Sequence, residues 1–141
     1  DRGFRFVILS GGRPCVDLIN IYTEKKIDLK KIHIFDMVCR AHKLNIKERE
    51  MVTHLDSMQS LTQIAILIGQ KTIPKRSVLL IDSVTSMLLY NSEQIFTQFV
   101  NNTVKKMRQR GIHIIILISK GENYNRLRNE LKYTCDQQKI F

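Results

Sequence analysis

The segment SVLLIDS, residues 77–83, places a carboxylate and a hydroxyl directly after an apolar run. Asp82 and Ser83 offer oxygen ligands of the kind that bind Mg²⁺ beside the phosphates of a nucleotide. The competing interpretation is structural, because aspartate and serine also cap turns at strand ends. Asp36 ends another apolar run, and two neighbouring carboxylates would bind a metal or share a proton. Nothing in the sequence brings Asp36 within reach of Asp82, so no paired carboxylate site is predicted.

Histidine and cysteine supply the other residues of a metal-binding type. Cys39, His42 and His54 form a C-x2-H segment followed by a distant histidine. Structural zinc sites have four ligands, usually in a tighter spacing pattern. We therefore predict no metal site. His33 and His113 lie inside apolar runs, where we expect buried side chains with hydrogen-bond partners.

The cysteine pattern indicates the redox environment of the chain. The three cysteines, Cys15, Cys39 and Cys135, include no CxxC pair and predict reduced, buried thiols. The sequence begins at Asp1 without a signal-peptide pattern, and no apolar run approaches the ~20 residues of a membrane-spanning helix. We expect a cytoplasmic protein, and whether Asp1 is a natural start stays open.

Short apolar runs alternate with amphipathic segments along the whole chain. The expected strands are 4–10, 31–38, 77–83 and 112–119, with a short fifth strand at 139–141. The expected helices are 15–26, 60–70, 92–110 and 122–133, whereas 39–58 has no clear pattern. Nearly continuous apolar strands are typical of sheets that are covered on both faces. The sequence predicts one α/β domain over residues 1–141, a three-layer sandwich with a mainly parallel sheet.

The segment IDSVTS, residues 81–86, resembles the Walker B segment of the RecA/KaiC-like P-loop ATPase superfamily. The resemblance extends in order and spacing over nearly the whole chain, through the segments 5–14, 25–36, 77–90 and 108–119. It implies a RecA-like sheet in which Asp82 and Ser83 occupy the nucleotide and Mg²⁺ position. The chain would be a single RecA/KaiC-like domain, or a core that lacks its N-terminal part.

The departures from this family argue against catalysis. The family binds triphosphate with a Walker A loop, GxxxxGK[ST], and the 141 residues contain no such loop. The positions of the family's catalytic glutamates hold Ser10 and Gly11, and neither side chain can activate water. The resemblance therefore implies a degenerate member with a vestigial site and no catalytic residues. We expect no cofactor, and Mg-ATP binding is the less favoured alternative.

The net charge of +10 favours polyanionic partners. Lys105, Lys106, Arg108 and Arg110 gather at the end of one predicted helix and are candidate polyanion contacts. Other basic residues also cluster where predicted helices lead into strands, which places them opposite the expected ligand edge. A solvated basic face and favourable helix-end charges are the competing interpretation.

The favoured function is a regulatory or scaffolding interaction module that contacts a protein partner or a second copy. The segment MLLYNSEQIFTQF, residues 87–99, is apolar enough for a protein contact, although such a stripe also builds a core. One alternative is a nucleic-acid-associated protein that uses the basic edge. Another is an ATP-binding domain whose Walker A segment lies upstream.

Overall fold

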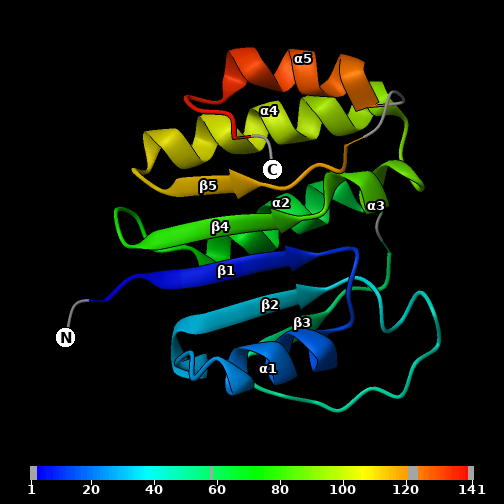
Figure 1. The fold of residues 1–141 in the computed structure, drawn as a ribbon, viewed down its shortest axis with the longest axis vertical. Coiled ribbons are helices and arrows are strands. Elements are labelled where there is room, and N and C mark those ends of the chain that lie inside the picture. The colour runs from blue at the N-terminus through cyan, green and yellow to red at the C-terminus, as the bar shows by residue number, and fades with distance from the viewer. Residues whose placement is uncertain (1–2, 58, 121–123, 140–141) are drawn as a thin grey trace.

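The computed structural model describes residues 3–57, 59–120 and 124–139. The described strands form one parallel sheet of five strands in the order β3-β2-β1-β4-β5 (Figure 1). Their bounds are β1 (Arg5–Ser10), β2 (Ile32–Asp36), β3 (Val52–His54), β4 (Ser77–Asp82) and β5 (His113–Ile116). The predicted α/β class with a parallel sheet is confirmed.

Five α-helices connect and follow these strands in the described part of the chain. They are α1 (Cys15–Glu24), α2 (Leu61–Lys71), α3 (Val84–Leu88), α4 (Glu93–Gln109) and α5 (Asn125–Thr134), with a 3₁₀ turn at Leu29–Lys31. The four helices expected from the sequence are present with slightly different ends. The short helix α3, which begins two residues after Asp82, was not predicted because five residues carry too little periodicity.

Helix α4 shows how local sequence sets these bounds. The Ser92 hydroxyl accepts a hydrogen bond from the backbone N–H of Ile95 and caps the first turn. The helix ends before Gly111, whose φ of +66° suits glycine, and the Ile112 N–H bonds back to the Met107 carbonyl. The strand β5 follows immediately.

Side chains that alternate along the strands build two separate cores. Val7, Leu9, Phe35, Leu79 and Ile81 pack with α2, α4 and α5 on one face of the sheet. On the other face Ile8, Ile32, Ile34 and Val52 pack with α1 and its Leu18 and Ile19. Helix α1 lies over the β1-β2-β3 half of the sheet, as Figure 1 shows.

The β4-β5 half of the α1 face has no helix over it among the described residues (Figure 1). Ile115 is 50% exposed and Phe6 is 43% exposed, although both lie on strands. We call this surface the open face and define it by residues Phe6, Val78, Leu80, Ile115 and Leu117. The expectation that the run 112–119 is covered on both faces is therefore wrong.

Three further expectations have clear outcomes. The unclear region 39–58 contributes β3, which pairs with β2 through Ile34 to Asp36. His33 is buried as expected, and its Nε2 lies 2.9 Å from the Thr53 hydroxyl. His113 is exposed, because it lies on the uncovered side of β5. The strand expected at 139–141 falls largely outside the described residues.

Burial should make His33 a source of acid sensitivity. Burial, followed by the positive charges of Lys71 and Arg5, lowers the pKa of His33 to about 4. The unfolded chain, with a histidine pKa of about 6.5, therefore binds the proton more readily than the folded chain. We expect the free energy of unfolding to fall as the pH drops from 7 towards 4. Urea denaturation across this range should show a weaker pH dependence in His33→Gln, and an unchanged dependence would contradict the assignment.

Candidate functional site

The carboxyl ends of the five parallel strands meet at one edge of the sheet. There Ser10 at the end of β1 is in register with Asp36 of β2 on one side and Asp82 of β4 on the other. The chain moves outward from β1 to β2 and β3 and then returns to place β4 and β5 beyond β1. Ligands of open α/β sheets usually bind where the strand order reverses in this way. The point of reversal lies between β1 and β4.

The backbone is tightly packed at this point. The Gly11 N–H donates a 2.8 Å hydrogen bond to the backbone carbonyl of Asp82. A Cβ atom added at Gly12 would lie 3.2 Å from the Ser86 hydroxyl oxygen, so the loop after β1 lies directly against α3. This close approach explains the Gly-Gly pair better than a phosphate loop does.

Asp82 and Ser83 offer few ligand groups. Among the residues that the structure describes, no hydrogen bond or ion pair reaches the Asp82 carboxylate. Its negative charge nonetheless affects Tyr22 of α1. Burial, followed by the charge of Asp82, raises the pKa of Tyr22, and the positive charge of Arg13 partly offsets this rise. The hydroxyl oxygens of Ser83 and Ser86 lie 3.3 Å apart. The arrangement supplies one carboxylate and two hydroxyls.

Ser10 and Gly11, which the resemblance would place at catalytic positions, supply no general base. The Ser10 hydroxyl is buried and donates a 2.7 Å hydrogen bond to the Arg13 carbonyl, and Gly11 has no side chain. Thr85 also makes a structural contact, since its hydroxyl accepts a hydrogen bond from the N–H of Ser119, which follows β5. These contacts agree with the structural interpretation of the hydroxyls in this region.

Asp36 makes its contacts within its own half of the sheet edge. Its Oδ1 accepts hydrogen bonds from the backbone N–H groups of Val38 at 2.7 Å and Cys39 at 2.9 Å. Its Oδ2 accepts from the Cys15 N–H at 2.6 Å and from the Cys39 thiol at 3.1 Å. The Asp36 carboxylate therefore ties the start of α1 to the turn after β2.

These contacts set the protonation of the group. Burial raises the pKa of Asp36, but hydrogen bonds from Cys39 and Cys15 outweigh it and lower the net pKa. Burial, followed by the hydrogen bond to Asp36 and its negative charge, raises the pKa of Cys15 to about 12. The same causes raise the pKa of Cys39. At neutral pH the carboxylate is ionised and both thiols are protonated.

His54 completes a buried cluster that sequence reasoning missed. One ligand atom each from Cys15, Asp36, Cys39 and His54 lies within 4.8 Å of the other three. Both ring nitrogens of His54 are buried without a hydrogen-bond partner among the described residues. His42, which the sequence grouped with Cys39 and His54, is exposed and lies outside the cluster. The sequence held one signal for this cluster. Cys15 and Cys39 follow predicted strands, and Asp36 lies near the end of one, so all three were expected near the same edge of the sheet.

The basic residues at the end of α4 have mixed roles. Arg110 donates to the carbonyls of Gly69 and Thr72 and so completes the end of α2. Arg108 forms an ion pair with Asp136 at 2.6 Å, and Lys105 is exposed. Lys106 lines a hollow of about 310 Å³ between α2 and α4. Two of the four candidate polyanion contacts are thus engaged within the chain.

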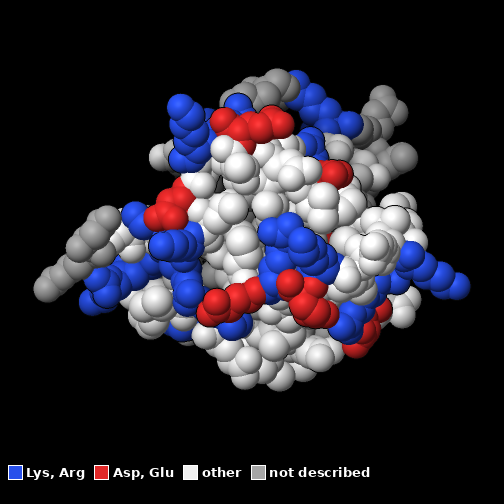
Figure 2. Space-filling model, turned by 90° about the horizontal axis from the view of Figure 1, so that it is seen from below, with Lys and Arg blue, Asp and Glu red and all other residues white. Residues whose placement is uncertain are grey.

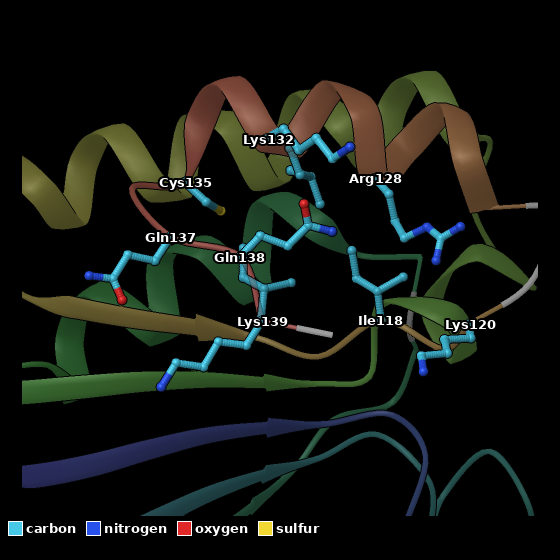
Figure 3. Close-up of a pocket in the computed structure, with 10 residues that line it drawn as sticks. Ile118, Lys120, Arg128, Lys132, Cys135, Gln137, Gln138 and Lys139 are labelled. Atoms are coloured by element: carbon cyan, nitrogen blue, oxygen red, sulfur yellow. The ribbon is translucent and has the colours of Figure 1, made fainter. Parts of the chain in front are cut away.

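A second basic group surrounds a hollow of about 220 Å³ beside β5 and α5. Figure 3 shows Arg128 and Lys132 on α5, Lys120 after β5 and Lys139 on the C-terminal segment. Among the described residues that line the hollow there is no Asp or Glu, so this lining suits an anionic ligand. On the face that carries α1 and β3, by contrast, acidic and basic side chains are interspersed (Figure 2).

Comparison with known proteins adds no identity to this geometry. No protein-family model matches the chain, and a search of curated proteins finds no match. Within the described residues, no helix is both long and apolar enough to cross a membrane.

Removal of the Asp36 carboxylate should destabilise the protein strongly. Asp36→Ala leaves three buried N–H groups without their acceptor, and we expect a loss of roughly 3 kcal/mol or more in the free energy of unfolding. Asp28→Ala is the matched control, because the exposed Asp28 carboxylate accepts one N–H bond from Lys30, and it should cost about 1 kcal/mol or less. Urea denaturation in the presence of a chelator measures both. Equal losses would contradict the role of Asp36.

Proposed function

We propose that this chain is a non-catalytic RecA/KaiC-like domain that acts as a regulatory or scaffolding module through protein contacts. The open face carries the proposal. It joins apolar side chains from three neighbouring strands, β1, β4 and β5, into one surface. Contiguous apolar surface of this kind marks interaction sites, because its burial gains roughly 25 cal/mol per Å².

A second apolar surface lies at the connection between α3 and α4. Leu89 is 77% exposed, and Tyr90 and Ile95 are also exposed. Phe96 and Phe99 from the same segment are buried in the core. The segment 87–99 therefore contributes to both the core and the surface, and its exposed part supports a protein contact.

The geometry at the sheet edge supports the non-catalytic part of the proposal. Ser10 and Gly11 offer no base for water activation, and Asp82 ends β4 at the point of reversal with no second carboxylate beside it among the strand-end residues that the structure describes. Mg²⁺ binds poorly to one carboxylate unless phosphate oxygens share it. A vestigial site fits these contacts better than an active one.

The cationic hollow beside β5 supports one alternative, a nucleic-acid-associated protein. Its four cations, Lys120, Arg128, Lys132 and Lys139, could contact phosphates without sequence specificity. The alternative ranks second, because Arg108 and Arg110 of the predicted basic edge are engaged in contacts within the chain.

Calorimetric titration with Mg-ATP, with Mg-ADP as comparison, tests the vestigial site. We expect no binding heat at millimolar nucleotide, since the position offers one carboxylate and no phosphate loop. Micromolar binding that Asp82→Ala abolishes would contradict the proposal and favour the ATP-binding alternative. Asp28→Ala is the control, because Asp28 lies in the exposed turn before β2, at the opposite ends of the strands.

Sedimentation velocity tests the open face as a contact between two copies. We expect a concentration-dependent dimer in the unmodified protein and a monomer in the double variant Phe6→Lys, Ile115→Lys, because two ammonium groups would have to be buried. Ile66→Lys is the matched control, since Ile66 is 54% exposed on α2, away from the open face, and it should dimerise normally.

Two results would count against this contact. One is a monomer at all concentrations, and the other is unchanged association of the double variant. A monomer whose retention on single-stranded RNA falls steeply with salt would favour the nucleic-acid alternative.

A further inference from the structure

We propose that Cys15, Asp36, Cys39 and His54 together bind one zinc ion. The four residues come from three adjacent strand ends: Cys15 begins α1 after β1, Asp36 ends β2 with Cys39 in the following turn, and His54 ends β3. Their ligand atoms lie within 4.8 Å of one another. Ligand atoms of tetrahedral zinc lie roughly 3.3–3.8 Å apart, given bonds of about 2.0–2.3 Å. Small side-chain rotations close that difference.

The ligand types select the metal. Two thiolates with an imidazole nitrogen and a carboxylate oxygen suit zinc, whereas Ca²⁺ and Mg²⁺ require oxygen ligands. All four residues are buried, with no position set aside for water or substrate. The arrangement is that of a closed structural site rather than a catalytic one.

His54 provides an observation that is independent of the cysteines. Its side chain is 9% exposed, and neither ring nitrogen has a hydrogen-bond partner among the described residues. Buried polar side-chain atoms normally bond to protein or to ordered water, and an exception calls for an explanation such as an ion. His33, on the neighbouring strand β2, follows that rule with its Thr53 contact. A metal ion beside Cys15 and Cys39 gives one His54 nitrogen the partner that it lacks.

Asp36 keeps an oxygen available for the ion. Its Oδ1 accepts two backbone N–H groups, whereas Oδ2 accepts one N–H and the Cys39 thiol. When the thiol loses its proton to become a ligand, one acceptor position of Oδ2 becomes free. The backbone hydrogen bonds to Asp36 can therefore remain, and they orient the ligand as outer contacts do in known sites.

The charge balance also permits the ion to enter. Without metal, the cluster carries the single negative charge of Asp36, since both thiols are protonated. Zinc binding replaces two thiol protons with two positive charges, so the buried cluster still carries one negative charge. The exchange therefore adds no net charge to the interior.

The site would anchor the longest irregular segment between strands. Residues 37–51 connect β2 to β3 with turns and no helix or long strand. Cys39 holds the start of this segment, and His54 lies just beyond its end. Bound zinc would join both to the first residue of α1.

Metal content and cobalt substitution test the proposal directly. Protein purified without chelator should contain one zinc per chain by elemental analysis. The metal-free, reduced protein should take up one Co²⁺ and show the visible bands of tetrahedral cobalt with a sulfur-to-cobalt charge-transfer band. Added zinc should displace the cobalt. No uptake, or a purely octahedral cobalt spectrum, would overturn the proposal.

Matched variants assign the ligands. Cys39→Ser and His54→Asn should each lower the affinity for zinc by roughly 100-fold or more. Cys135→Ser and His42→Asn change the same residue types outside the cluster and should bind as the unmodified protein does. Normal binding by the first pair would overturn the assignment.

A measurement on the unmodified protein remains decisive if those variants fail to fold. Zinc titration in buffers of different ionisation enthalpy reports the number of protons released. We expect about two at pH 7, one from each thiol. Release of none would show that the cysteines are not ligands and would overturn the proposal.

Discussion

The buried Asp36 carboxylate is the constraint around which one half of the sheet edge is organised. An ionised group in the interior is costly unless hydrogen bonds replace water. Asp36 receives such bonds from the first residue of α1 and from the turn after β2. Those bonds fix where α1 begins and how the chain leaves β2. They also bring Cys15 and Cys39 to the same carboxylate, so hydrogen bonds to one buried charge place two further members of the cluster.

The two carboxylates of the sheet edge have different environments because β1 separates them. Asp36 lies in β2 and Asp82 in β4, each in register with Ser10. One is surrounded by donors from α1 and its own turn. The Asp82 carboxylate has no hydrogen-bond donor among the described residues, and its negative charge contributes to the raised pKa of Tyr22. Neighbouring strand ends in one sheet thus hold one carboxylate with several hydrogen-bond donors and one with no donor among the described residues.

Sequence patterns predicted the elements that their own residues determine. Apolar runs ending at Ser10, Asp36 and Asp82 located β1, β2 and β4 because buried parallel strands carry a strong local signal. The strand β3 has three residues among polar ones, and it exists because β2 offers hydrogen bonds to it. His54 therefore had no predicted position, and the four-residue cluster was invisible without it. The exposure of Ile115 was equally hidden, since apolar composition does not reveal which helix covers a strand.

The open face follows from the number of helices available to each side of the sheet. Among the described helices, α2, α3, α4 and α5 contribute to the core on one face, whereas α1 alone covers part of the other. A helix is about 10 Å wide and strands lie about 4.8 Å apart, so one helix covers two or three strands and cannot cover five. The apolar side chains of β4 and β5 therefore need cover that the described residues do not supply. A partner surface can provide it, and this geometric shortfall is the strongest physical reason to regard the chain as an interaction module.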